Sequence, residues 1–210
     1  MKGAKELLKR FTVVSDHLKR KRIIRWTNDG RPFPPPNDIK QLAILYYGVT
    51  YELDTLIETG TYLGDMIWAQ KDFFRQIFSI ELSEDLYTRA KKRFASFPHI
   101  KLLQGDSSEK IGEIVHQLNA PALFWLDGHY SGGITAKGEK VCPIFEELTH
   151  IFSSSQPHVV IIDDARLFVG KDDYPTIREL AAFVEENSGY SFRTENDFIL
   201  LTPSANSKHT

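Results

Sequence analysis

Short apolar segments alternate with longer amphipathic segments along most of this chain. The apolar segments are rich in Ile, Leu, Val or Phe and predict strands at 55–58, 76–81, 99–104, 121–127 and 158–163. Between them, the spacing of apolar residues predicts helices near 63–73, 84–96, 108–118 and 142–153. Regular alternation of this kind is typical of a parallel sheet with helices on both faces, so we predict a doubly wound α/β fold.

The last part of the chain departs from this alternation. A helix is predicted from Pro175 to a stop at Gly189, and two strands follow at 190–195 and 197–202. Because little more than Asn196 separates these strands, they are expected to pair as an antiparallel hairpin at a sheet edge. The remaining polar residues, 204–210, are expected to form a disordered tail.

The first residues, 1–37, are predicted to be an arm outside this domain. An amphipathic helix is expected through Leu7 and Phe11, and a proline-rich run ends the arm. Asp38 is then expected to cap a helix that leads to the first strand. The domain itself is predicted to span 38–203.

Charge is unevenly distributed between the arm and the body. The net charge is −2, but residues 1–31 hold ten Lys or Arg against three acids, and the rest of the chain holds sixteen against twenty-five. A basic arm can meet phosphate groups, an anionic membrane surface or the acidic body of a neighbouring copy in a homo-oligomer, and a solvated helix face is the alternative. Specific nucleic-acid binding is disfavoured, because the body is acidic and no known binding module is present.

Cysteine content and hydropathy bear on the compartment. With Cys142 as the one cysteine, the chain has neither an intrachain disulfide nor a thiolate zinc cluster, which suits a reducing compartment. No stretch approaches the roughly 20 apolar residues of a membrane span. We therefore expect a soluble, cytoplasmic protein.

The end of the first predicted strand carries a turn that suits a nucleoside. Gly60 lets the backbone turn tightly or approach a ligand, and Glu81 ends the second strand about 20 residues later, where an acid commonly binds ribose hydroxyls. The turn lacks the three-glycine dinucleotide fingerprint, and a plain glycine-containing loop is the alternative. The turn residues expected at the nucleoside are Glu58, Thr59, Gly60, Thr61, Tyr62 and Gly64.

Acidic residues follow two further predicted strands. Asp127 comes after one of them, and Asp163 and Asp164 come directly after the other. Because the carboxyl ends of parallel strands meet at one edge of the sheet, we expect these three side chains to lie together. Carboxylates this close repel one another unless a cation or donor neutralises them, and oxygen ligands suit Mg²⁺. For any one of them, a capping carboxylate in solvent is the alternative.

Asp106 and His129 are the other candidates for chemistry. Asp106 follows a strand and opens a helix, so it is either a helix cap or a contact to an adenine amino group. His129 lies two residues after Asp127 in a glycine-rich loop. It is a candidate general base because the pKa of histidine lies near neutrality, and a surface histidine is the alternative.

Together these residues resemble class I S-adenosylmethionine-dependent methyltransferases over residues 50–203. The pair Asp127-x-His129 with Asp163-Asp164 is similar to the macrocin O-methyltransferase branch, whose members modify hydroxyls of sugars on natural products. The resemblance implies a Rossmann-like sheet ordered 3-2-1-4-5-7-6 with strand 7 antiparallel. It also implies S-adenosylmethionine bound by the turn together with Glu81, Asp106 and Asp127, Mg²⁺ held by Asp127, Asp163 and Asp164, and catalysis by His129 with Asp127.

Four further side chains are candidates for contact with the donor or the acceptor. Tyr62 and Trp125 are expected near the adenine or the sulfonium, with core packing as the alternative. Tyr130 and Arg166 are expected near the acceptor.

The function predicted from sequence is therefore methyl transfer to a hydroxyl of a sugar or other small hydroxylated acceptor. Two other functions are open: a catalytically silent member of the fold tethered by its arm, and an NAD-dependent oxidoreductase, since Glu81 serves either ribose.

Overall fold

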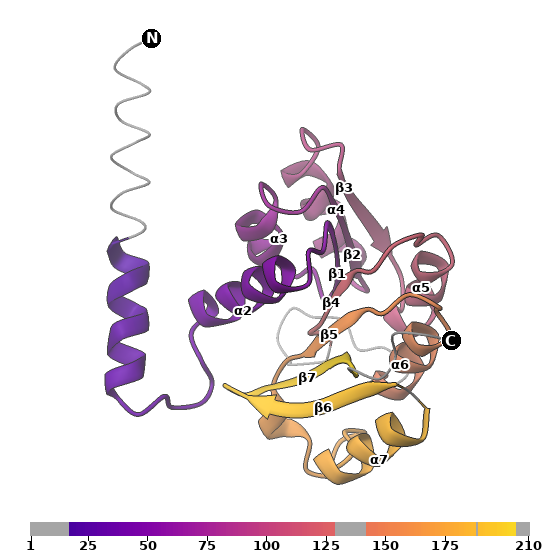
Figure 1. The fold of residues 1–210 in the computed structure, drawn as a ribbon. Coiled ribbons are helices and arrows are strands. Elements are labelled where there is room, and N and C mark those ends of the chain that lie inside the picture. Colours follow the sequence, from indigo (N-terminus) through magenta and orange to yellow (C-terminus); the bar gives the residue numbers. More distant parts are fainter. Residues whose placement is uncertain (1–16, 129–141, 188, 205–210) are drawn as a thin grey trace.

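The computed structural model describes residues 17–128, 142–187 and 189–204 of the 210-residue chain. Within these ranges seven strands form one sheet in the order β3-β2-β1-β4-β5-β7-β6 (Figure 1). Strands β1 to β5 are parallel, and β7 is antiparallel to both of its neighbours. The predicted fold and strand order are confirmed. The strands are β1 (Thr55–Thr59), β2 (Gln76–Glu81), β3 (Ile100–Gln104), β4 (Leu123–Leu126), β5 (Val159–Ile162), β6 (Tyr190–Glu195) and β7 (Phe198–Pro203).

Strand ends differ from the prediction most clearly in β4, which is shorter than 121–127 on both sides. After Leu126 the chain leaves the ladder, because the amide of Asp127 donates to the side chain of Thr59 and not to a strand carbonyl. The predicted hairpin of β6 and β7 is confirmed. Its turn residues Asn196 and Asp197 both have positive φ, 47° and 70°, which is the geometry of a type I′ turn between twisted strands.

Helices cover both faces of the sheet, as predicted (Figure 1). Along β4, Leu123 and Trp125 pack on the side of α2, α3 and α4, whereas Phe124 and Leu126 pack on the side of α5, α6 and α7. This alternation follows from the pleat of a strand that is buried on both faces. The helices are α2 (Asn37–Thr50), α3 (Asp65–Gln70), α4 (Glu84–Arg93), α5 (Ser107–Val115), α6 (Ile144–Phe152) and α7 (Ile177–Asn187), and a 3₁₀ turn, η1, covers Ala165–Leu167.

The N-terminal helix, residues 17–28 in the described part of the chain, stands apart from the sheet in Figure 1. The prediction that Asp38 caps α2 is wrong. Pro36 occupies the N-cap position without a side-chain bond, and Asp38 is buried and accepts two hydrogen bonds of 2.6 and 2.9 Å from the guanidinium of Arg22. A guanidinium binds both oxygens of a carboxylate, which a single backbone amide at a helix start cannot do.

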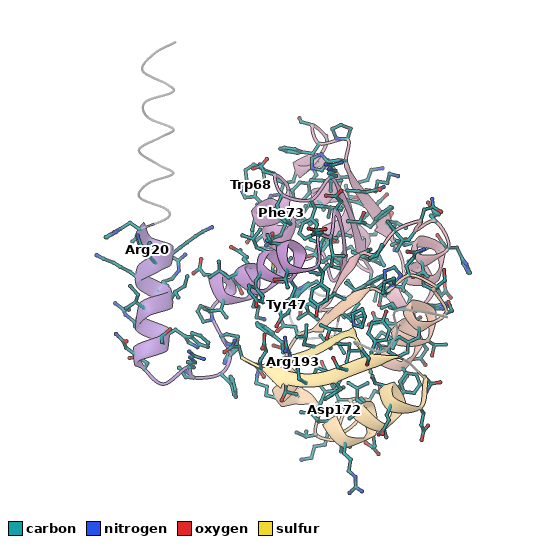
Figure 2. The ribbon with its side chains drawn as sticks, in the orientation of Figure 1. Arg20, Tyr47, Trp68, Phe73, Asp172 and Arg193 are labelled. Atoms are coloured by element: carbon teal, nitrogen blue, oxygen red, sulfur yellow. The ribbon has the colours of Figure 1, made fainter. Side chains whose placement is uncertain are left out.

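The opposite end of α2 is held to the edge strand β6. The Tyr47 hydroxyl donates to Glu195 over 2.7 Å and accepts from Arg193 over 2.7 Å; Tyr47 and Arg193 are labelled in Figure 2. With Asp38 bound at its first turn, α2 is fixed at both ends.

Two predicted segments lie outside the described residues: the helix through Leu7 and Phe11, and residues 205–210 of the tail. In the part of the chain that is described, none of the helices has the length and apolar character needed to cross a bilayer.

Glu147 on α6 is buried, with 1% of its surface exposed, and burial raises its pKa from 4.5 to about 8. The folded state therefore holds a proton that the unfolded chain releases, so Glu147 makes the protein less stable as the pH rises through this interval. The loss approaches about 1.4 kcal/mol per pH unit for one such group. We expect Glu147→Gln to flatten the dependence of the unfolding free energy on pH, measured by denaturant titration from pH 5 to 8.

The matched control is Glu185→Gln on the exposed side of α7. It should keep the slope of the wild-type protein. An unchanged slope in Glu147→Gln would mean that this carboxyl is ionised in the folded protein.

Candidate functional site

The strand order reverses between β1 and β4, and the residues predicted for the site lie at or after the carboxyl ends of β1 to β5. Such a reversal leaves a crevice at the carboxyl ends of the strands, where ligands of doubly wound folds bind. Thr59 at the end of β1 is buried, and its Oγ1 accepts hydrogen bonds from the amides of Asp127 over 3.2 Å and Gly128 over 3.0 Å. The ends of β1 and β4 are thus joined directly.

Gly60 forms the turn after β1. Its φ is +81°, and a Cβ atom at this position would lie 2.6 Å from the carbonyl oxygen of Asp127. The next residue, Thr61, is buried with its Oγ1 2.5 Å from the Oγ of Ser79. Tyr62 also has a positive φ, 48°, which is uncommon for residues other than glycine and marks a constrained backbone. The absence of a side chain at Gly60 therefore lets the turn pack directly against the end of β4.

Two buried glutamates hold this turn to β2. Glu81 accepts hydrogen bonds from the amides of Tyr62 over 2.8 Å and Ser83 over 2.9 Å. Glu58 accepts from the Oγ of Ser79 over 2.6 Å. Burial raises the pKa of Glu58 to about 8, with a further contribution from the charge of Glu81. At neutral pH Glu58 is therefore protonated and can donate a hydrogen bond, whereas Glu81 offers acceptor oxygens.

The three predicted metal ligands come together. Asp127, Asp163 and Asp164 each bring one carboxylate oxygen within 4.8 Å of the others. Asp163 is fully buried, and Asp164 has a φ of +56°, a backbone conformation that costs energy and is common at functional sites. Burial and the neighbouring charges of Asp163 and Asp164 hold the pKa of Asp127 well above its usual range.

This acid cluster, defined as Asp127, Asp163 and Asp164, fits a hard divalent cation. An ion with oxygen ligands at about 2.1–2.5 Å separates opposite ligands by about 4–5 Å, and the cluster has that span. The raised pKa of Asp127 also reflects mutual repulsion that a cation in the cluster relieves.

Lys40 on α2 is a member of this site that the sequence did not point out. Its Nζ contacts Oδ2 of Asp163 and lies 3.7 Å from Oδ1 of Asp164. Burial opposes the charge on Lys40, but the three surrounding acids outweigh burial and raise its pKa. A signal existed in the spacing: Lys40 precedes Ile44 and Tyr47 by one and two helical turns, on the buried face of α2.

Three other predicted residues have structural roles. Oδ1 of Asp106 accepts from the amide and hydroxyl of Ser108 over 2.9 and 2.6 Å, so Asp106 caps α5. Gly64 lies against the ring of Phe94, where a Cβ would approach to 2.6 Å. Of the two places predicted for Trp125, the structure supports the core: it is 1% exposed, because alternation along β4 places it on the face that α2, α3 and α4 cover.

Arg166 was expected at the acceptor, which stays a prediction, and its guanidinium lies between two carboxylates. It donates to Asp164 over 2.7 Å and also contacts Asp197, whose other oxygen accepts from the Arg166 amide. Arg166 therefore holds Asp164 in place from the side of β7. His129 and Tyr130, the predicted base and an acceptor contact, lie outside the described residues.

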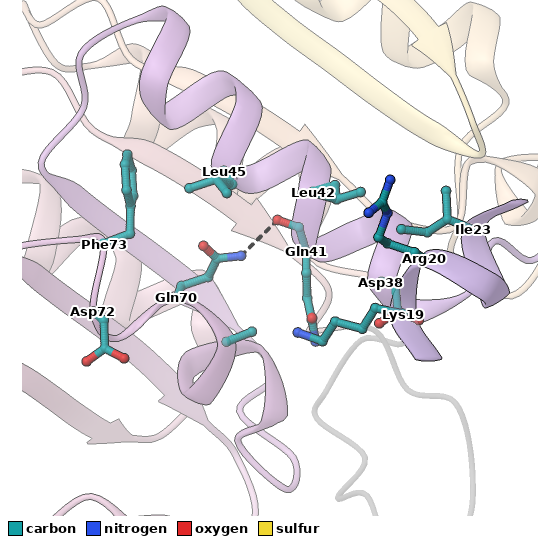
Figure 3. A pocket seen from close by; sticks show the side chains of 11 residues that line it. Lys19, Arg20, Ile23, Asp38, Gln41, Leu42, Leu45, Gln70, Asp72 and Phe73 are labelled. Atoms are coloured by element: carbon teal, nitrogen blue, oxygen red, sulfur yellow. Dashed lines mark hydrogen bonds between the residues drawn. The ribbon is translucent and has the colours of Figure 1, made fainter. Parts of the chain in front are cut away.

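A separate cavity of about 500 Å³ lies away from the strand ends, between the N-terminal helix, α2 and α3 (Figure 3). Gln70 lines the cavity, and its side-chain amide donates a hydrogen bond to the backbone carbonyl of Gln41 over 2.9 Å. The walls are Leu42, Leu45 and Phe73 together with Lys19 and Arg20. None of the predicted site residues contributes to this cavity.

Comparison with solved structures identifies the architecture. A methyltransferase from Podospora anserina, PaMTH1, bound to SAH, aligns over 94% of this chain and 96% of its own, with a TM-score of 0.60 and 13% identity. The fold is that of the class I methyltransferases. The O-methyltransferase TomG from Streptomyces achromogenes, in complex with SAM, aligns over 89% of both chains, with a TM-score of 0.57 and 14% identity.

A third methyltransferase-fold structure, a putative caffeoyl-CoA O-methyltransferase from Staphylococcus aureus, aligns over 92% of this chain and 98% of its own, with a TM-score of 0.55 and 14% identity. At the level of sequence, no family model and no curated protein matches the chain. The predicted methyltransferase fold is confirmed, and the finer resemblance to the macrocin branch stays a prediction.

Proposed function

We propose that this protein is an S-adenosylmethionine-dependent O-methyltransferase that acts on a hydroxyl of a sugar or other small hydroxylated acceptor. The observation that carries the proposal is the juxtaposition of the Gly60 turn with the acid cluster, joined through Thr59 at the reversal of the sheet. The similar structures that hold SAM or SAH support a methyl donor at this place in the fold.

The donor site is proposed on the turn and the neighbouring strand ends. The Gly60 turn, which packs against the end of β4, is assigned to the donor. Glu81 holds the amide of Tyr62, and its remaining lone pairs are assigned to the ribose hydroxyls. Asp106 has one oxygen engaged in capping α5, and its other oxygen is assigned to the adenine amino group. The complete proposed set is Glu58, Thr59, Gly60, Thr61, Tyr62, Gly64, Glu81, Asp106 and Asp127.

The acceptor site is proposed at the acid cluster. Asp127, Asp163 and Asp164 would hold Mg²⁺, which when bound lowers the pKa of a coordinated hydroxyl and stabilises the charge that develops on its oxygen. The chain's own residues fix the positions: Thr59 orients the backbone of Asp127, and Arg166 orients Asp164. His129 is assigned as the base that takes the hydroxyl proton while the acceptor oxygen bonds to the methyl carbon, the bond from that carbon to the donor sulfur breaks, and S-adenosylhomocysteine leaves.

The test of this function is calorimetric titration of the purified chain with S-adenosylmethionine and, separately, with NAD. Each titration is made with Mg²⁺ and with a chelator. Saturable binding of the methyl donor alone is expected, and it justifies a screen of hydroxylated acceptors for methyl transfer. Binding of NAD alone would replace the proposal with an oxidoreductase, and binding of neither would favour a catalytically silent member of the fold.

Glu81→Ala is expected to weaken S-adenosylmethionine binding about tenfold or more, because it removes an acceptor for the ribose and frees the Tyr62 amide that orders the turn. The matched control is Glu84→Ala, an exposed residue three positions later in α4. Donor affinity is measured by the same calorimetry. An unchanged affinity in Glu81→Ala would remove Glu81 from the ribose site.

A further inference from the structure

Lys40 brings a positive charge into the acid cluster from a different part of the fold. The cluster lies at the ends of β4 and β5, whereas Lys40 belongs to the first turn of α2. Its side chain is 14% exposed, and that of its partner Asp163 is 0% exposed. A lysine is rarely this buried unless it is paired, so the contact is a specific part of the site.

The contacts of Lys40 span the cluster. Its Nζ touches Asp163, lies 3.7 Å from Asp164 and interacts electrostatically with Asp127. Arg166, the other cation at the cluster, pairs with both Asp164 and Asp197, so it neutralises only one carboxylate of the cluster and only in part. Among the described residues, Lys40 is the cation that faces all three ligands proposed for the metal.

An ammonium group and a divalent cation compete for such a position. Oδ1 of Asp163 already accepts from the amide of Asp164 over 2.8 Å, so Oδ2, which Lys40 contacts, is the oxygen left for a metal ion. The like charges of the ammonium and the ion repel strongly at a separation of a few ångströms in a buried site. A metal ion that binds all three carboxylates must therefore move the Lys40 ammonium away from Asp163.

We propose that Lys40 is an internal counter-cation of the acid cluster, which divalent cations displace when they bind. This inference rests on the metal ligands of the proposed function. It goes beyond them, because it makes metal affinity a property of α2 as well as of the strand ends. Lys40 acts here as a competitor of the metal, and its removal is expected to improve metal binding.

The test is calorimetric titration of the full-length chain with MnCl₂, without methyl donor or acceptor. Lys40→Met keeps most of the side-chain volume and removes the charge, and it is expected to bind Mn²⁺ at least about tenfold more tightly than the wild-type protein. The control is Lys71→Met. Lys71 has a similarly covered side chain, 13% exposed, and also pairs with an aspartate, Asp72, but it is not part of the cluster. Its variant should bind Mn²⁺ like the wild-type protein.

Lys40→Met also leaves three carboxylates without their counter-cation, so its folding is followed by thermal unfolding with and without MnCl₂. The metal is expected to raise the midpoint of Lys40→Met by more than that of the wild-type protein. Equal or weaker Mn²⁺ binding, or an equal or smaller rise in the midpoint, would overturn the proposal. These readouts contain no methyl donor, so a failure here is distinct from a failure of donor binding.

Discussion

Replacing Gly60 by alanine is expected to weaken binding of S-adenosylmethionine about 100-fold or more, equivalent to about 2.8 kcal/mol. The added Cβ would lie 2.6 Å from the carbonyl oxygen of Asp127, and φ at this position is +81°. The clash is with backbone, which cannot rotate away as a flexible side chain would. The turn must therefore shift from the end of β4, and the donor loses its site. Calorimetric titration with S-adenosylmethionine measures the effect.

Gly30→Ala is the matched control for this prediction. Gly30 has nearly the same φ, +84°, but nothing lies within 4 Å of a Cβ built there. It therefore carries the same backbone strain without the clash. Donor affinity should stay at the wild-type value in Gly30→Ala. If Gly60→Ala also kept that affinity, the turn after β1 would not be the donor site.

Replacing Asp163 by asparagine is expected to abolish measurable divalent-cation binding and metal-dependent methyl transfer while S-adenosylmethionine still binds. Asparagine keeps the oxygen that accepts from the amide of Asp164 over 2.8 Å, but it removes the charge that faces the cation and Lys40. Loss of a direct ligand should cost about 100-fold or more in metal affinity. Lys40 loses a charged partner, which lowers the unfolding free energy, but burial of the Asp163 charge and its repulsion by Asp164 are relieved, which raises it. The protein is therefore expected to stay folded.

Three measurements separate these effects: titration with MnCl₂, titration with S-adenosylmethionine, and denaturant unfolding. Asp72→Asn is the control, because Asp72 also pairs with a lysine but its side chain is 85% exposed. A folded Asp163→Asn protein that has lost donor binding, or one that binds Mn²⁺ normally, would contradict the assignment of Asp163 to the metal.

Much of the fold was predictable because most strands, namely β1, β2, β4, β5 and β7, are short segments that are largely buried on both faces. What the sequence could not show is where each strand stops. β4 ends at Leu126 because the amide of Asp127 donates a hydrogen bond to the side chain of Thr59, which is distant in the sequence. The start of α2 was misassigned for a similar reason, since Asp38 binds Arg22 and not its own helix. Both errors come from side chains that meet only after folding.

The acid cluster was predictable from topology alone, since Asp127, Asp163 and Asp164 all follow parallel strands. The contact of Lys40 with this cluster was not predictable, because it depends on how α2 crosses the sheet. Its spacing from Ile44 did indicate that Lys40 lies on the buried face of α2. The core position of Trp125 could have been predicted from the alternation of side chains along β4. That argument is simpler than the expectation that this aromatic ring contacts the donor.

Thr59 has a consequence for the precision of the proposed reaction. Two hydrogen bonds to one hydroxyl, of 3.2 and 3.0 Å, join the strand that carries the donor turn to the strand that carries Asp127. The proposed donor and acceptor sites are thus linked directly through the ends of β1 and β4. Methyl transfer depends steeply on the distance between donor and acceptor. Through these two backbone contacts, a single buried threonine thus helps to set the distance at which the proposed reactants meet.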